Sequence, residues 1–238
     1  MSYYFNITIL LFCVTILVSC SFESDDLILD ETAGHNFNLY DQYEDGYGNL
    51  GVVVYVSKKT SSISNKYIIV ISADESKQKW SETNSAVVRA DSIGLTEIHD
   101  HQFGIGVLQL MQSTGIEEFP AQNWCNLKNH TDVYAGSWHL PTHYELKTLL
   151  LNKVDDVNYT LQKIGGDLID ENALYWTCVE DYPGCDILSS TSENKTTYSP
   201  ENRAIPITPK YKTHPDKDRW LKTNEYRVRA IKFVYYGK

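Results

Sequence analysis

The residues with the clearest capacity for chemistry in this sequence are its five cysteines. Cys20 ends the tetrapeptide Leu17-Val18-Ser19-Cys20, which overlaps the end of an apolar run over residues 7–18. An apolar core, small residues and then a cysteine are typical of a lipobox, in which the cysteine is lipidated and becomes the new N-terminus. An ordinary signal peptide with an incidental cysteine is the alternative interpretation. We therefore predict lipidation at Cys20.

The cysteines after residue 20 are odd in number, because only Cys125, Cys178 and Cys185 remain. Cys178 and Cys185 flank Val-Glu-Asp-Tyr-Pro-Gly, whose Pro-Gly pair favours a turn. In an oxidising envelope this spacing favours a disulfide between Cys178 and Cys185. Cys125 would then be a buried helical thiol, and Cys125–Cys178 is the competing pair.

Two segments carry residues that metal ions prefer, but neither predicts a metal site. His99 and His101 flank Asp100, whereas tetrahedral zinc needs three or four ligands in a defined context. Residues 41–49 are acidic and rich in glycine but lack the alternating ligand spacing of a calcium loop. We predict a surface loop and a turn, with no metal and no cofactor.

No catalytic residues are predicted. The sequence contains no Ser-His-Asp order, HExxH, P-loop or GxGxxG motif. An acidic net charge of −10 also argues against a nucleic-acid partner, because phosphate neutralisation needs a basic face.

A ligand-binding candidate lies in the polar loop over residues 210–222. Positive charge concentrates there in an otherwise acidic chain, around an aromatic side chain that could stack a sugar ring. The candidate residues are Trp220, Arg219, His214 and Lys217. The alternative is a solvated loop whose cations balance neighbouring carboxylates.

The element on which the rest of the chain depends is the stretch over residues 136–146. Thr142 followed by Glu145 forms a capping box, and Pro141 precedes the helix that it opens. Leu146, Leu149 and Leu150 then lie on one helix face. Trp138 and Leu140 alternate before it as in a short half-buried strand.

Hydrophobic periodicity and turn residues predict the remaining elements. A hairpin joins residues 51–56 and 67–72, Pro206 makes 204–207 an edge strand, and the last strand closes the sheet. The helices are predicted at 104–113, 121–128 and 157–164, and further strands at 174–178 and 226–236.

The chain divides into a signal peptide at residues 1–19, a lipidated and flexible acidic tether at 20–45, and one domain at 46–238. The apolar run is too short to span a bilayer. The acidic residues after Cys20 resemble the export signal of Bacteroides-type surface lipoproteins. That resemblance implies lipid anchoring to the outer membrane, with the domain exposed at the cell surface.

The pattern Gly-x-Trp-x-Leu-Pro-Thr-x-x-Glu-Leu at residues 136–146 resembles the signature of the Lcl C-terminal-domain family, most of whose members have unknown function. The resemblance implies a C-type lectin-like fold, similar to that of formylglycine-generating-enzyme-like domains. It extends in order over residues 51–56, 67–72 with Trp80, 121–125, 175–178 and 226–231.

Together these observations predict an α+β, C-type lectin-like single domain with short helices packed on a mostly antiparallel, loop-rich sheet. Family members at the ends of adhesin-like surface proteins imply a non-catalytic binding role, for a surface glycan or a partner protein. A structural or accessory subunit of a surface assembly is the second hypothesis. An enzyme with two redox-active thiolates is disfavoured, because the cysteines lie on different elements.

Overall fold

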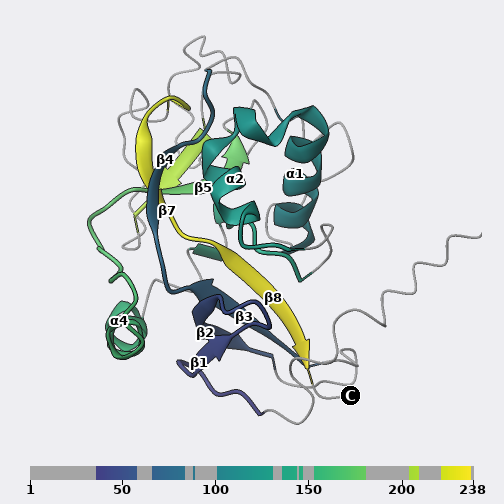
Figure 1. The fold of residues 1–238 in the computed structure, drawn as a ribbon. Coiled ribbons are helices and arrows are strands. Elements are labelled where there is room, and N and C mark those ends of the chain that lie inside the picture. Colours follow the sequence, from purple (N-terminus) through teal and green to yellow (C-terminus); the bar gives the residue numbers. More distant parts are fainter. Residues whose placement is uncertain are drawn as a thin grey trace, which may run out of the picture.

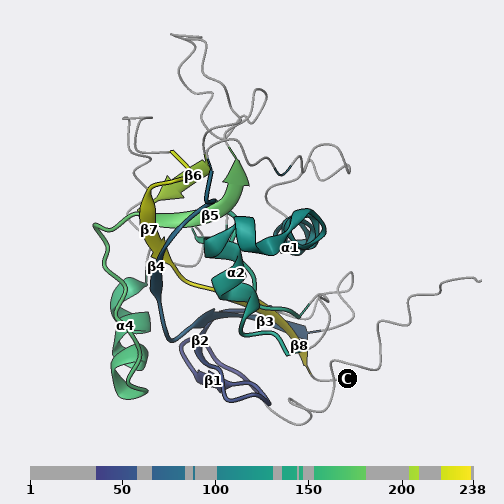
Figure 2. The same ribbon diagram turned by 45° about the horizontal axis from the view of Figure 1, so that its top comes forward.

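The structure of the protein is a computed structural model. The described residues are 36–57, 66–83, 88, 101–130, 136–143, 145–146, 153–180, 204–208 and 221–236. They form two four-stranded sheets with helices on both sides, as Figures 1 and 2 show. Helices and antiparallel-rich sheets confirm the α+β class, while the C-type lectin-like assignment stays a prediction.

The first sheet has the strand order β1-β2-β3-β8, and every neighbouring pair is antiparallel. Its strands are β1 (Gln42–Glu44), β2 (Leu50–Val56), β3 (Lys66–Ser72) and β8 (Ile231–Tyr236). The β2–β3 pair confirms the predicted hairpin. The strand β1 pairs with β2 and belongs to this sheet, although the sequence analysis assigned residues 20–45 to the tether.

The second sheet has the order β4-β7-β5-β6. Its strands are β4 (Ser76–Lys79), β7 (Glu225–Val228), β5 (Tyr175–Glu180) and β6 (Ala204–Ile207). Strands β5 and β7 run parallel, and the other two pairs are antiparallel. Pro206 lies in β6 at the edge, as its missing N–H donor predicts.

The single closing strand predicted over residues 226–236 is wrong. The chain leaves the second sheet after Val228 and enters the first at Ile231. The buried Arg229 lies at this break and donates to the carbonyl oxygens of Ser72 (2.8 Å) and Asp167 (2.9 Å). A buried guanidinium needs such acceptors, and the crossing between sheets supplies them.

The helices α1 (His101–Thr114), α2 (Pro120–Asn126) and α4 (Val154–Lys163) confirm the three predicted helical segments. Helices α1 and α2 lie together on one side of the sheets, and α4 lies on the other side beside β2 (Figures 1 and 2). Gly165 ends α4 with φ 72°, the left-handed conformation that glycine tolerates. No helix in the described ranges is long and apolar enough to span a membrane.

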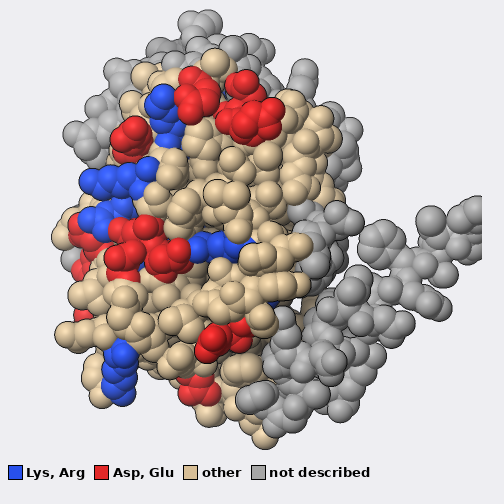
Figure 3. Space-filling view, in the orientation of Figure 1, with Lys and Arg blue, Asp and Glu red and all other residues tan. Residues whose placement is uncertain are grey.

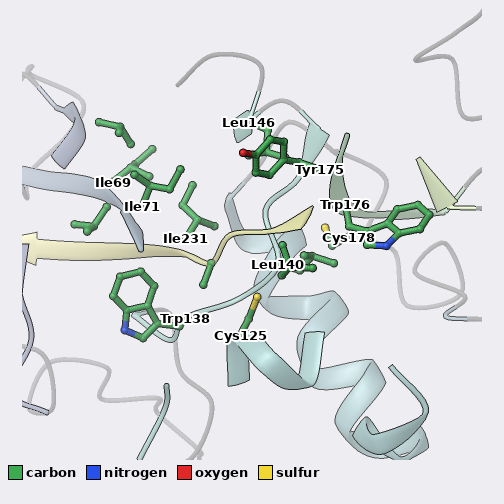
Figure 4. Close-up of a cluster of buried hydrophobic side chains, with 14 of the residues drawn as sticks. Ile69, Ile71, Cys125, Trp138, Leu140, Leu146, Tyr175, Trp176, Cys178 and Ile231 are labelled. Carbon is green, nitrogen blue, oxygen red and sulfur yellow. The ribbon is translucent and has the colours of Figure 1, made fainter. Parts of the chain in front are cut away.

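A continuous hydrophobic core joins the two sheets through residues 138–140 (Figure 4). Trp138 and Trp176 are both buried in this core. Trp80 is buried as well, and its indole nitrogen donates to the Thr177 carbonyl at 2.9 Å. The largest aromatic side chains of this part of the chain are therefore used for packing.

Candidate functional site

The capping box has the predicted geometry. The Thr142 backbone N–H donates to Glu145 Oε2 at 2.7 Å, and the Glu145 N–H donates to Thr142 Oγ1 at 3.1 Å. Leu146 begins the buried helical face, while Leu149 and Leu150 lie outside the described residues. Both predicted reciprocal hydrogen bonds are therefore confirmed.

The residues before the capping box differ from the predicted half-buried strand. Trp138, His139 and Leu140 are all buried, so the polar position does not face solvent. His139 alone forms a strand-like bridge, exchanging two backbone hydrogen bonds of 3.0 Å with Ile231 of β8. Because two sheets and two helices surround this segment, no side of it is left for water.

Asp45, at the end of β1, is a buried carboxylate that organises the segment from the opposite side. It accepts hydrogen bonds from Trp138 Nε1 (2.9 Å) and from the backbone N–H groups of Tyr47 (3.0 Å) and Asn49 (2.9 Å). Lys232 Nζ lies 3.5 Å from the same carboxylate. The β1–β2 loop and the residue 136–146 stretch are thus joined through one side chain.

The ionisation of Asp45 reflects these contacts. Burial opposes the charged form, but the hydrogen bonds from Trp138 and Asn49 and the positive charge of Lys232 favour it. Their sum lowers the pKa of Asp45 below its ordinary value. Asp45 is therefore a charged hydrogen-bond acceptor that holds the surrounding loop in place, and it does not act as a proton donor.

Asn129, just beyond α2, fixes Trp138 from another direction. Its Oδ1 accepts from the Trp138 backbone N–H at 2.7 Å, and its Nδ2 donates to the Trp138 carbonyl at 2.9 Å. The Asn49 side chain extends this scaffold by donating to the Lys128 carbonyl at 3.1 Å. The β1–β2 loop is consequently tied to the end of α2.

Above this scaffold the rings of Tyr47 and His130 stack on the protein surface. Their centroids are 4.2 Å apart with an interplanar angle of 27°. Tyr47 is 50% exposed and His130 is also exposed. We call this pair the Tyr47–His130 surface. Two aromatic rings held outward on a hydrogen-bonded loop offer a flat face on which an apolar or sugar ring can stack.

The ligand-binding residues predicted from the sequence, His214, Lys217, Arg219 and Trp220, lie outside the described residues. The end of their loop is described at Lys222, which is buried.

Lys222 forms an ion pair with Glu180, and its Nζ lies 4.7 Å from the centroid of the Trp80 ring. Lys222 therefore belongs to the core and adds no charge to a surface site.

The predicted cysteine roles are described only in part. Cys125 and Cys178 are free, buried thiols. Burial raises the pKa of both, and for Cys178 the neighbouring Glu145 raises it further. Neither is a thiolate nucleophile. The free thiol of Cys178 shows neither the predicted disulfide to Cys185 nor the competing one to Cys125. Cys20 and Cys185 lie outside the described residues, so lipidation stays a prediction.

A second polar cluster lies where β4 and β7 meet. The carboxylate of Glu75 pairs with Arg227 and, at 3.0 Å, with Arg229. It also accepts from the Tyr175 hydroxyl at 3.0 Å, and burial together with this carboxylate raises the pKa of Tyr175 to about 12. Acidic and basic side chains are interspersed on the face in Figure 3. These contacts describe a structural ion-pair network.

Metal ligands do not gather within the described ranges, where no group of three or more His, Cys, Asp or Glu side chains could hold an ion. Of the His99-Asp100-His101 sequence, only His101 is described, as the first residue of α1. The absence of catalytic residues, metals and cofactors stays a prediction.

The fold and surface define a class of protein, an α+β domain of two joined sheets that presents an exposed aromatic pair. A fimbrial protein from Bacteroides ovatus ATCC 8483 has a similar fold, with a TM-score of 0.56 and 14% sequence identity. The match covers 84% of this chain and 49% of the fimbrial chain, so this chain spans about half of that protein. At this identity the likeness concerns the fold alone.

No family model matches the chain, and no curated protein matches its sequence. The resemblance to the Lcl C-terminal-domain family therefore stays a prediction.

Proposed function

We propose that the chain is a lipoprotein of the bacterial cell surface whose domain binds a glycan or a partner protein without catalysing a reaction. The observation that carries the proposal is the Tyr47–His130 surface, in which two stacked rings lie exposed on a loop organised by the buried Asp45. The proposed anchor is the lipid on Cys20.

Rigidity supports a binding role for this surface. Asp45 receives hydrogen bonds from the backbone of Tyr47 and Asn49, and the Asn49 side chain reaches Lys128. A loop held in one conformation loses little entropy when a ligand binds, so more of the contact energy appears as affinity. The exposed ring faces could stack against the C–H groups of a sugar or against an apolar side chain.

A structural or accessory subunit of a surface assembly is the second proposal, and the likeness in fold to the Bacteroides ovatus fimbrial protein favours it. The two roles are compatible, because an accessory subunit can also present a binding surface. The fold supports this role only by analogy, since one fold serves many functions.

The test is a glycan array probed with the full chain, purified in detergent, together with Tyr47→Ala and His130→Ala. Tyr159→Ala is the matched control, because Tyr159 is 62% exposed on α4 and lies far along the chain from the β1–β2 loop. Trp220→Ala and Arg219→Ala test the loop that the sequence favours.

Glycan binding that is lost in Tyr47→Ala and kept in Tyr159→Ala would support the proposed site. Binding that is lost only in Trp220→Ala and Arg219→Ala would move the site to the 210–222 loop. If the array shows no binding and the chain instead co-purifies from membranes with surface subunits, the assembly role is supported and glycan binding is contradicted.

A further inference from the structure

Three polar side-chain atoms lie unpaired in the interior around the residue 136–146 stretch. They are Nε2 of His139, Oε1 of Glu145 and Nε2 of Gln122, and none of the three has a hydrogen-bond partner among the described residues. His139 and Gln122 are 0% exposed and Glu145 is 4% exposed, so bulk solvent does not reach them. Buried polar atoms in folded proteins nearly always pair with the protein or with an ordered water, so these three atoms indicate a binding site.

The other polar atoms of His139 and Glu145 hold the two side chains in place. His139 Nδ1 lies 2.9 Å from the Ser137 carbonyl oxygen. Glu145 Oε2 accepts from the Thr142 backbone N–H at 2.7 Å, as part of the capping box. Neither side chain can turn to find another partner without losing one of these contacts. The two unpaired atoms therefore have fixed positions.

The distance between these two atoms matches a single bridging molecule. His139 Nε2 lies 3.9 Å from Glu145 Oε1, which is too far for a direct hydrogen bond. Two hydrogen bonds of about 2.8 Å that meet at one water oxygen can span any separation up to about 5.6 Å. A water both donates and accepts, so it can pair with the ring nitrogen and the carboxylate oxygen whichever of them carries a hydrogen.

We propose that one water molecule is bound in the core between His139 Nε2 and Glu145 Oε1, as an integral part of the folded domain. Buried waters of this kind pair with polar groups that the protein leaves unsatisfied, and they are costly to remove.

Gln122 of α2 offers a donor for a third hydrogen bond. Its Oε1 accepts from the Leu140 N–H at 3.2 Å. Because Leu140 directly follows His139, this contact places the Gln122 amide beside the same part of the chain. Buried waters typically make about three hydrogen bonds, and the water oxygen can accept from an amide while its two hydrogens are donated. We expect Gln122 Nε2 to be the third partner.

The surroundings favour a neutral occupant over a metal ion. No group of three or more His, Cys, Asp or Glu side chains in the described part of the chain could hold an ion. The Cys178 thiol near Glu145 has a pKa raised by burial and then by that carboxylate, so it is a poor metal ligand. Apolar side chains surround the stretch (Figure 4).

Helix α1 closes the site on one side. A Cβ on Gly104 would lie 2.8 Å from His139 Nε2 and 2.5 Å from Cδ2 of the same ring, so the helix backbone packs against this edge of the imidazole. A side chain at position 104 would fill this space. The glycine therefore lets α1 cover the ring and separate it from solvent.

The bound water would join parts of the core that are otherwise held separately. His139 exchanges two backbone hydrogen bonds of 3.0 Å with Ile231 of β8. Glu145 caps the helix that follows Pro141. A molecule bound to both side chains fixes the start of this helix relative to β8.

The direct test is a crystal structure of the full chain at a resolution that shows ordered waters. We expect a density peak that refines as water within about 3.2 Å of both His139 Nε2 and Glu145 Oε1. The proposal would be overturned by the absence of a peak, by a direct contact between the two side chains, or by an ion at this position.

A second measurement counts long-lived internal waters in solution through the magnetic relaxation dispersion of the solvent oxygen-17 nucleus. His139→Phe keeps a flat ring but removes Nε2, so it should hold one long-lived water fewer than the wild type. His130→Phe is the matched control, because it makes the same replacement at an exposed position and should keep the wild-type count. Equal counts in the wild type and in a folded His139→Phe protein would contradict the proposal. If His139→Phe does not fold, the wild-type density decides.

Discussion

Replacing Asp45 by alanine removes one acceptor that Trp138, Tyr47 and Asn49 share, and it also removes the carboxylate beside Lys232. All of these donors lose the acceptor together, because the carboxylate is the point where they converge. The Lys232 side chain is itself buried, so it would be left without its ion pair. The substitution therefore tests whether Asp45 organises the site.

The magnitude follows from two kinds of loss. Leaving one member of a buried ion pair uncompensated costs about 3–5 kcal/mol, so Asp45→Ala should destabilise the domain by about that amount. Asp45→Asn keeps an oxygen that can accept from the loop amides but loses the charge. Its cost should be smaller, about 1.5–3 kcal/mol, the range for hydrogen bonds to a charged group.

The assay is urea unfolding of the full chain, followed by tryptophan fluorescence because the indole of Trp138 contacts Asp45 directly. Glu44→Gln is the matched control, since Glu44 is the preceding residue and is exposed on β1. It should change stability by no more than about 0.5 kcal/mol. Equal effects of Asp45→Ala and Glu44→Gln would refute the role given to Asp45.

The same carboxylate predicts a pH effect of defined sign. Its pKa is lowered in the folded protein, so its contribution is present above the unfolded value of 3.8 and is lost as the pH falls toward the folded value. Acid melts of Asp45→Asn should lack this component. A wild-type and an Asp45→Asn protein that lose stability equally between pH 5 and pH 3 would contradict the assignment.

Three further predictions concern the anchor and the capped helix. Cys20→Ala should release the protein from the membrane fraction or leave it unprocessed, and unchanged fractionation and migration would exclude lipidation there. Thr142→Ala should cost about 1 kcal/mol in urea melts, because the Glu145 N–H loses its acceptor. Leu146→Ala should cost about 2–5 kcal/mol because the side chain is buried, and a neutral result would show that this helical face does not pack in the core.

Local structure was predictable where adjacent residues determine it. The β2–β3 hairpin, the turn at residues 45–49 and the end of α4 at Gly165 follow from alternation and glycine chemistry. The Thr142–Glu145 capping box is also a property of four consecutive residues, and its hydrogen bonds are present. Each of these features needs no information from a distant segment.

The division into two sheets was not predictable in the same way. Residues 226–236 alternate as a single strand would, yet Arg229 turns the chain from one sheet to the other. The acceptors that Arg229 needs come from residues 72–75 and 167, far away in the sequence. Because these acceptors are distant in the sequence, the alternation of residues 226–236 gives no sign of the break between the two sheets.

The Tyr47–His130 surface also could not be predicted from the sequence, because its two residues are far apart in the chain. Tyr47 lies in an acidic, glycine-rich turn and His130 lies beyond a separate helix, so neither predicts the other. An aspartate that hydrogen-bonds the backbone two residues ahead was a readable sign that the loop is ordered. The sequence instead favoured the 210–222 loop, because it concentrates charge beside Trp220.

The central claim is that the Tyr47–His130 surface binds a ligand at the cell surface. It is tested most directly by the dissociation constant of the full chain for the strongest glycan on the array, measured by isothermal titration calorimetry. Removing one stacking ring should cost about 0.5–1.5 kcal/mol, so Tyr47→Ala should weaken binding by about two- to tenfold. Tyr159→Ala should bind like the wild type. Equal affinities of wild type, Tyr47→Ala and His130→Ala would contradict the claim.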